Sequence, residues 1–354
     1  MTGEAGAIPP ATLETVAETV PGATEDSPLK MPRGAWWSIL KRVYVMTGFH
    51  NLSLLAAGVA FFAFLAFVPL IGSIVLLYGL IGDPQTVAQS VDLLNGIAPP
   101  EVLTILRDQL LAIVTSSKTA QGFGLLLAIV FSLYGAMRAA TAMISALNII
   151  YEEYETRGIV QTTAVAAAIT TGMVAVAVVG ILAISLFAYV SNFLAPYLGS
   201  VAALLIQVAT WLLAGALVSF TFAIFFRYAP DRRAAKWRWL SVGSTLSTLL
   251  WLAITLGFGF YVANISDYNA TYGSLAAVVV FLMWLFLSAY AVLIGAEVNA
   301  ETERQTMVDS TVGPDQPIGQ RGAVMADNVA LDQASRAILE KKRQRRSDNV
   351  ADSV

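Results

Sequence analysis

The chain has 354 residues, of which 57% are hydrophobic and only 13% are charged, and its formal net charge is −3 at pH 7. Soluble domains carry about 25% charged residues, and more than half of the charges here lie outside the stretch from Leu52 to Asn299. That stretch has too few polar residues to cover a soluble domain, and the small net charge gives no reason to expect nucleic acid as a partner. We predict an all-α, polytopic membrane protein whose partners are membrane lipids.

The residue types also limit the chemistry. Cysteine is absent and His50 is the only histidine, so one chain can form no disulfide, thiolate metal site or multi-histidine metal site. The sequence contains no glycine-rich phosphate-binding loop and no other motif of a soluble enzyme. We therefore expect no cofactor, no bound metal, no catalytic residue and no enzymatic activity. The oligomeric state stays open.

The N-terminal region has two parts. Residues 1–32 contain Pro and Glu but no early apolar run, which predicts a disordered cytoplasmic tail without a signal peptide. Residues 33–50 contain the pair Trp36 and Trp37 among basic residues. This mixture is typical of a helix that lies in the headgroup layer, although an ordinary extension of the first span is the alternative.

A membrane domain is predicted over residues 33–302. A helix needs about 20 apolar residues to cross a bilayer, and six stretches meet this requirement. They are Leu52–Leu80, Gly122–Ile150, Gln161–Ser191, Val201–Phe226, Leu240–Val262 and Tyr272–Asn299.

The first stretch contains Pro69 near its middle. Proline lacks the backbone donor and clashes with the preceding turn, so we expect a kink, with two shorter segments meeting at Pro69 as the alternative. Residues 83–121 follow and are too polar to cross the membrane. Their apolar residues recur at helical spacing after Pro99 and Pro100, which predicts an external helical hairpin, either a lid or a passive cap.

Basic residues in the connections predict the orientation. They are frequent before the first span, after the second span at Arg157, after the fourth span from Arg227 to Arg238, and in the C-terminal tail. The opposite connections carry only Arg107 and Lys118. By the positive-inside rule, we expect both termini to lie in the cytoplasm.

The C-terminal region, residues 303–354, reads as a polar, partly disordered cytoplasmic tail that is dispensable for folding. Five basic residues near its end could bind anionic lipid headgroups, although a solvated tail is the alternative. They are Lys341, Lys342, Arg343, Arg345 and Arg346.

Ionisable residues inside the spans suggest a site. Arg138 lies in the second span, about 12 residues before its inner end, and Glu297 lies near the inner end of the sixth. A buried charge in a bilayer normally faces the bundle interior, so we expect Arg138 and Glu297 to approach each other, together with Asn148 and Asn299. This intramembrane polar cluster would serve binding or gating, or act as a structural clamp. The acids Glu152, Glu153 and Glu155 follow the second span and are interpreted as a solvated helix end.

The last span carries a recognisable motif. It begins with Tyr272, Gly273, Ser274, Leu275 and Ala276 and ends with Gly295, Ala296, Glu297 and Asn299. With these residues the region from Trp36 to Glu301 resembles the YihY / virulence factor BrkB family of bacterial inner-membrane proteins. The Ala-rich first span ending at Pro69 and the sequence Ala146-Leu147-Asn148 agree with that family.

The resemblance implies six spans in the inner membrane. An older name for the family, ribonuclease BN, fits this chain poorly, because a nuclease needs metal ligands or acid–base groups and basic RNA contacts. Two function classes remain. The chain is either a transporter or translocase of lipids or small molecules, or a non-transporting envelope scaffold associated with virulence.

Overall fold

The computed structural model describes residues 17–81, 118–194, 200–264 and 275–330. Helices dominate these ranges, and the described residues form no β-strand, only an isolated bridge between Ala235 and Thr311. In chain order the elements are the 3-10 helix η1 (Pro28–Lys30) and the α-helices α2 (Arg33–Phe49), α3 (Leu52–Ile81), α6 (Lys118–Ile150), α7 (Ile159–Leu194), α8 (Ser200–Tyr228), α9 (Trp237–Asn264), α11 (Ala276–Glu303) and α12 (Val324–Asp327).

The long helices confirm the prediction of an all-α polytopic membrane protein. Within the described ranges, five helices are long and apolar enough to cross a membrane, and the pair α2 and α3 makes a sixth span if it is counted as one. The helices coincide with the six predicted spans to within a few residues at most ends. The reason is the length of the apolar runs, because a helix satisfies every backbone polar group within itself in lipid.

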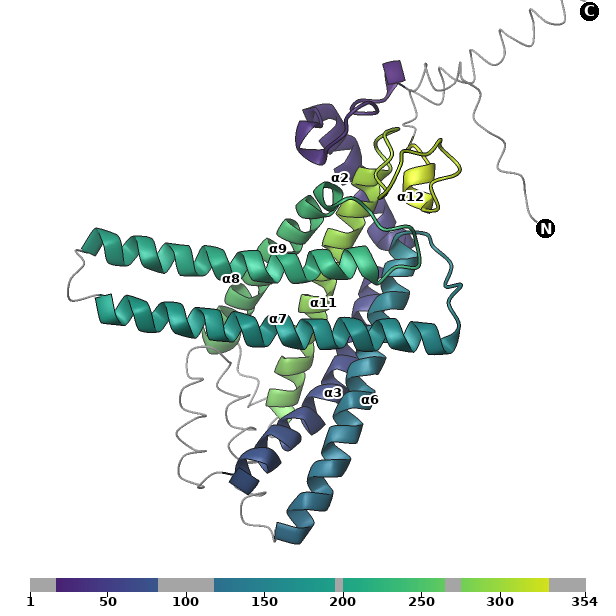
Figure 1. Ribbon diagram of the computed structural model, residues 1–354. Helices are drawn as coiled ribbons and strands as arrows, with labels where there is room; N and C mark the ends of the chain where they lie inside the picture. The colour runs from purple at the N-terminus through teal and green to yellow at the C-terminus, as the bar shows by residue number, and fades with distance from the viewer. Residues whose placement is uncertain (1–16, 82–117, 195–199, 265–274, 331–354) are drawn as a thin grey trace, which may run out of the picture.

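The helices are arranged around α11 (Figure 1). α3 and α6 lie side by side, and α11 packs against both α3 and α9. α7 and α8 form an antiparallel pair that extends away from the other helices in this view. The described ends of the chain and the short connections after α6 and α8 gather at one end of the molecule, which we call the cap end.

A sharp bend separates α2 from α3. The two helices meet at 63°, at a break formed by His50 and Asn51. Asn51 adopts φ 51°, in the left-handed region, which asparagine tolerates better than most residues. α2 buries Ala35, Ile39 and Val43 and exposes aromatic residues such as Tyr44 and Phe49. The 63° bend excludes a straight extension of the first span, and the place of α2 in the headgroup layer stays a prediction.

α3 and α6 approach closely at one point. A Cβ atom added to Gly135 would lie 2.6 Å from the Cα of Ala66, so only glycine allows this contact. α3 continues as one helix through Pro69, which excludes two separate segments meeting there. Lipid-facing helices tolerate an internal proline when neighbouring groups satisfy the freed carbonyl.

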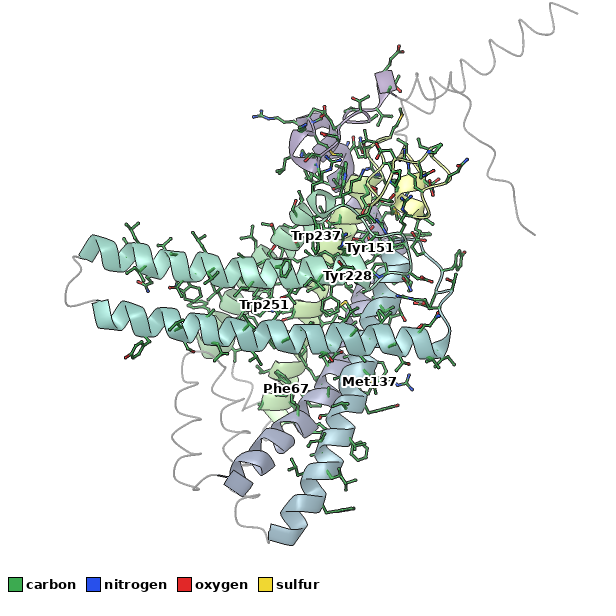
Figure 2. The ribbon with its side chains drawn as sticks, in the orientation of Figure 1. Phe67, Met137, Tyr151, Tyr228, Trp237 and Trp251 are labelled. Carbon is green, nitrogen blue, oxygen red and sulfur yellow. The ribbon has the colours of Figure 1, made fainter. Side chains whose placement is uncertain are left out.

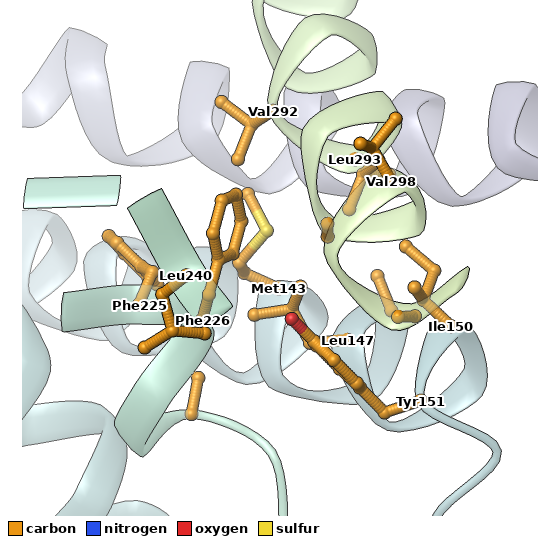
Figure 3. Close-up of a cluster of buried hydrophobic side chains, with 14 of the residues drawn as sticks. Met143, Leu147, Ile150, Tyr151, Phe225, Phe226, Leu240, Val292, Leu293 and Val298 are labelled. Atoms are coloured by element: carbon orange, nitrogen blue, oxygen red, sulfur yellow. The ribbon is translucent and has the colours of Figure 1, made fainter. Parts of the chain in front are cut away.

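The apolar core lies between the cap end and the middle of the helices (Figure 3). Leu147 and Ile150 of α6, Phe226 of α8, Leu240 of α9 and Leu293 of α11 are all fully buried there. These four helices therefore share one core at this end, whereas many large apolar residues on α7 and α8 are exposed. Exposed apolar side chains of this kind suit contact with lipid.

The two terminal segments are packed on the cap end, which corrects the sequence prediction. Thr306 donates to the carbonyls of Ala23 and Glu25, at 3.2 and 2.7 Å, and Gln305 donates to that of Pro21 at 2.8 Å. Residues 17–32 were expected to be disordered and residues after 303 to be a solvated tail. Instead each segment satisfies the polar groups of the other, a non-local pairing that composition alone does not reveal.

Arg321 holds the C-terminal segment together. Its guanidinium donates to the carbonyls of Gln316, Met307 and Ala326 at 3.0, 2.6 and 2.7 Å, and the residue is only 4% exposed. A loop that buries a charged side chain in this way is an ordered cap. Three predicted features lie outside the described residues: most of the external segment 83–121, the family-motif residues Tyr272, Gly273 and Ser274, and the basic cluster at residues 341–346.

Candidate functional site

A pocket of about 330 Å³ lies between α3 and α6. Its walls are almost entirely apolar and aromatic. The lining residues are Phe62, Leu65 and Pro69 from α3 and Ala128, Phe131, Tyr134, Gly135 and Arg138 from α6. Leu65, Phe131 and Tyr134 are each about half exposed, so the pocket opens sideways from the helix pair. The close contact at Ala66 and Gly135 lies beside it and holds the two helices together.

Among the residues that the structure describes, Arg138 is the only charged one that lines this pocket. Its Nε donates to the hydroxyl of Tyr134 at 3.1 Å, and the guanidinium lies 5.4 Å from the centre of the same ring. Among the described residues Arg138 has no acidic partner. Twelve residues separate it from the end of α6, which places it about 18 Å along the helix from the cap end. With the end of α6 taken as the inner boundary of a bilayer core of about 30 Å, this depth is near the middle, and the residue is exposed at the surface of the helix pair.

The predicted four-residue cluster is therefore wrong as a single site. Arg138 faces the pocket and contacts its own helix, whereas Asn148, Glu297 and Asn299 lie at the cap end in separate networks. The reason is the different depth of the residues along their helices. α6 and α11 run in the same direction, and each side chain contacts a partner at its own depth. The long side chain of Arg138 turns to Tyr134 one turn earlier rather than down to the cap.

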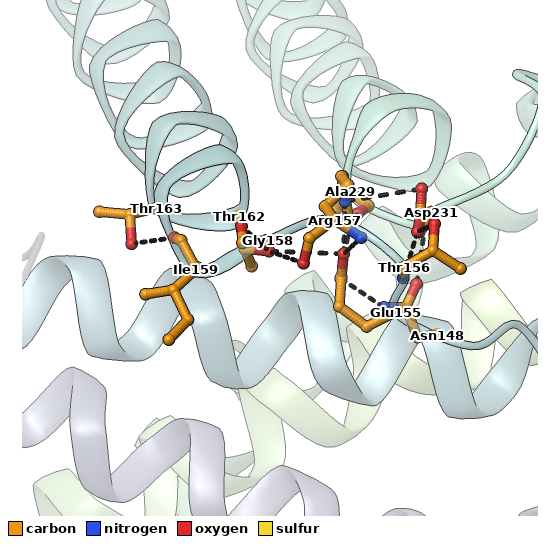
Figure 4. A network of polar contacts seen from close by, with 10 residues as sticks. All are labelled: Asn148, Glu155, Thr156, Arg157, Gly158, Ile159, Thr162, Thr163, Ala229 and Asp231. Carbon is orange, nitrogen blue, oxygen red and sulfur yellow. Dashed lines mark hydrogen bonds and ion pairs between the residues drawn. The ribbon is translucent and has the colours of Figure 1, made fainter.

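Asn148 joins two connections (Figure 4). Its amide donates to Glu155 at 2.8 Å, and its oxygen accepts the N–H of Asp231 at 2.8 Å. Glu155 in turn accepts two hydrogen bonds from Arg157, at 2.6 and 2.7 Å. The hydrogen bonds from Arg157 hold the pKa of Glu155 below its usual range. This network fastens the start of α7 to the end of α8.

The other two acids after α6 are also engaged, so the interpretation as a solvated helix end is wrong. Glu152 pairs with Arg304 at 3.3 Å, and Glu153 accepts the N–H of Val324 at 2.7 Å. Burial raises the pKa of Glu153. Both contacts attach the C-terminal segment to the end of α6.

Asn299 has a packing role. Its side-chain oxygen accepts the N–H of Gly243 at 2.8 Å, and its nitrogen donates to the carbonyl of Leu240 at 3.3 Å. Gly295, the family-motif glycine, lies so close to α9 that an added Cβ would collide with Ser247 and the carbonyl of Gly243. The motif at the end of α11 thus builds the α9–α11 interface.

Three acids on the last two turns of α11 each contact a different basic side chain from another part of the chain. Glu297 lies 3.0 Å from His50, Glu301 forms an ion pair with Arg42, and Glu303 pairs with Arg232 at 2.7 Å. All three carboxylates are fully buried. Burial disfavours the charge of Arg232, but the adjacent Glu303 outweighs it and raises the pKa of the guanidinium.

Sequence reasoning identified Glu297 but missed Glu301, Glu303 and His50. The available signal was the spacing of the acids, which places Glu297 and Glu301 one turn apart on the same helix face. No group of three or more His, Asp or Glu residues in the described ranges is arranged to hold a metal ion.

Aromatic and basic side chains mark the boundary of the cap end. Figure 2 shows Tyr228 and Trp237 there, and their ring centres lie 6.4 Å apart. The guanidinium of Arg227 lies 4.5 Å from the ring centre of Trp237. Tryptophan and tyrosine beside arginine are typical of a membrane–water interface, so the cap lies on the aqueous side of this boundary.

Comparison with known proteins gives a consistent family. The family described as virulence factor BrkB matches residues 43–318. Ribonuclease-like protein YfkH of Bacillus subtilis (strain 168) is 23% identical over 266 residues, which cover 74% of this chain and 94% of YfkH. A UPF0761 membrane protein of Paraburkholderia xenovorans (strain LB400) is 32% identical over 171 residues. Another, from Alkalilimnicola ehrlichii, is 48% identical over 89 residues.

The coverage of these relatives differs. The alignments take in 47% and 24% of this chain, but only 38% and 20% of the two UPF0761 proteins. The matched part of this chain therefore spans well under half the length of each UPF0761 relative. No solved structure matches the chain.

Proposed function

The chain belongs to the virulence factor BrkB family of membrane proteins, and from that premise we propose that it binds an anionic lipid in the α3–α6 pocket and moves it across the bilayer. The membrane is the inner membrane of a bacterium, and the cap end lies in the cytoplasm. The basic residues of the connections at the cap end support this orientation.

Arg138 is the observation that carries the proposal. An arginine near the middle of the bilayer costs at least about 2.5–3.5 kcal/mol, and the described residues provide it with a tyrosine but no carboxylate. A phosphate group of a lipid would supply the missing charge, since guanidinium and phosphate form paired hydrogen bonds. A residue with a purely structural role would be expected to have its counter-charge within the protein.

The rest of the pocket suits the hydrocarbon part of the same ligand. Phe62 and Leu65 on one side and Phe131 on the other form apolar walls, and the sideways opening lets a lipid enter from the bilayer. Binding sites of this kind are mostly apolar with few orienting polar groups. A small polar solute would find only one charged partner here, which favours an amphipathic ligand.

An envelope scaffold is the second candidate. The buried ion pairs of the cap and the shared apolar core support it, because they make the cap end a rigid platform. The name of YfkH describes that protein as ribonuclease-like. We assign no catalytic chemistry to this chain, whose pocket offers one arginine and one tyrosine as polar groups.

Reconstitution into liposomes tests the proposal. Vesicles that contain a fluorescent anionic phospholipid would be treated with a quencher that does not cross the membrane, and the fraction exposed to the quencher would be followed over time. We expect faster exposure with the native chain than without protein. Arg138→Leu removes the charge and is expected to slow exchange about 10-fold, as for the loss of one charged contact of about 1.4 kcal/mol. Ala128→Phe fills the pocket and is expected to slow exchange by a similar factor.

Two controls accompany these variants. Lys30→Gln removes an exposed cation at the cap end and is expected to leave the rate unchanged, and the tryptophan fluorescence of each variant reports whether it is folded. If folded native protein does not accelerate exchange of any phospholipid, the translocase proposal is wrong and the scaffold remains. If Arg138→Leu exchanges lipid at the native rate, the pocket is not the pathway.

A further inference from the structure

His50 and Glu297 form a buried pair at the break between α2 and α3. The Nδ1 atom of His50 lies 3.0 Å from Oε2 of Glu297, and the two side chains are 4% and 0% exposed. The second nitrogen of the ring, Nε2, and the second oxygen of the carboxylate, Oε1, are both buried without a hydrogen-bond partner. An unsatisfied buried polar atom is costly, so a further reason is needed for this arrangement.

The charges around the pair isolate Glu297. Glu301 faces Arg42 and Arg304, and Glu303 faces Arg232, so each of these acids has a permanent cation. Glu297 faces only His50, whose charge depends on pH. Besides His50, the ionisable groups that act on Glu297 include Glu301, Glu152 and Tyr151, none of which is a cation, and the described residues of α9 that hydrogen-bond to this part of α11 are uncharged.

The pair also sits on a joint. His50 is the C-terminal cap of α2, and its N–H reaches the carbonyl of Met46 at 2.8 Å. Asn51 follows in the left-handed region, and α3 begins at Leu52. A contact from His50 to Glu297 therefore ties the joint directly to α11. The same helix α3 carries Phe62 and Leu65, one wall of the pocket.

We propose that His50 and Glu297 together form a proton-binding site, and that its occupancy sets the position of the α2–α3 joint. With one proton the pair is a neutral unit, imidazolium with carboxylate. When that proton leaves to water, the carboxylate of Glu297 stays buried with no cation. Water must then reach Oε1, which requires the end of α2 to move away from α11. The joint is closed when the site is protonated and open when it is not.

This inference rests on the proposed function in one respect only, the role of the movement of the α2–α3 joint. In lipid transport, that movement would couple a proton to the position of the pocket wall. The proton site itself can be tested without any lipid. Failure of lipid exchange with an intact titration would remove the translocase but not the proton site.

The single histidine makes the first test direct. Full-length protein with 15N-labelled histidine, in lipid nanodiscs, gives side-chain signals from His50 alone, and these are followed by NMR from about pH 5 to about pH 9. We expect the pH dependence of the His50 signals to differ between the native chain and Glu297→Gln, because the ring lies 3.0 Å from this carboxylate. The control Asp315→Asn changes an exposed acid and should match the native chain. Equal midpoints in the native chain and Glu297→Gln would overturn the proposal.

The second test measures the joint directly. The chain has no cysteine, so spin labels can be attached through Trp37→Cys on α2 and Phe61→Cys on α3, both of which are exposed. The distance between the labels is expected to change with the same midpoint as the His50 signals. In the variant His50→Asn, the distance between the labels should not change with pH. A distance that stays constant across the titration of the native chain would show that the site does not control the joint.

Discussion

The side-chain oxygen of Asn299 accepts the backbone N–H of Gly243 at 2.8 Å, across the interface between α11 and α9. The nitrogen of the same amide donates to the carbonyl of Leu240. One buried side chain therefore bonds to two backbone groups within one turn of the neighbouring helix. Such bonds require the two helix backbones to lie close together, and glycine at residues 243 and 295 permits this.

Gly243→Ala should destabilise the protein. The added methyl group would collide with the carbonyl of Gly295 and with the Asn299 side chain, and overpacking of this kind costs about 1–3 kcal/mol. Thermal unfolding in detergent, followed by tryptophan fluorescence, measures the change. Gly257→Ala is the matched control on the same helix, because no atom lies within 4 Å of its added Cβ. A native midpoint for Gly243→Ala would mean that the interface can relax.

The ordered C-terminal segment gives a second prediction. Arg321→Met removes the donors to three backbone carbonyls, and each buried acceptor left without a partner costs about 1–3 kcal/mol. We expect faster cleavage between residues 304 and 330 in limited proteolysis, together with a lower unfolding temperature. Gln320→Ala alters the exposed neighbouring side chain and should be cleaved like the native chain. Equal cleavage of Arg321→Met would restore the view of this segment as a loose tail.

Acid should weaken the network at Glu155. The hydrogen bonds from Arg157 lower the pKa of Glu155 in the folded protein below its usual range. Because the folded pKa is the lower one, the stabilisation is fully present above the unfolded value and is lost as the pH falls through the folded value. Glu155→Gln should therefore lose less stability on acidification than the native chain. Denaturation midpoints at neutral pH and at about pH 3 give the comparison, with Glu18→Gln as an exposed control; parallel losses in both proteins would contradict it.

Orientation in the membrane can be tested with single cysteines. Tyr154 at the cap end and Leu275 at the start of α11 are both highly exposed, and the chain has no cysteine of its own. A thiol reagent that does not cross the membrane should label Leu275→Cys in intact cells, and Tyr154→Cys only after lysis. The reverse pattern would place the cap outside the cytoplasm.

The sequence by itself determined the membrane class and the positions of the spans, because long apolar runs allow only one kind of structure in lipid. It also determined the family, since the residues from Tyr272 to Asn299 suggested the relationship that the match over residues 43–318 confirms. The kink expected at Pro69 stays a prediction, because α3 continues as one helix through this residue.

Only the tertiary structure decided the polar partners. The sequence made Arg138 and Glu297 a plausible pair. The partner of a polar side chain depends on its depth and on which helix faces pack together, and these follow from close contacts such as that of Ala66 with Gly135. His50 belongs to Glu297, and Arg138 faces the pocket. The terminal segments show the same limit, because their polar groups are satisfied by residues almost 300 positions away, and a local reading of composition contains no information about such contacts.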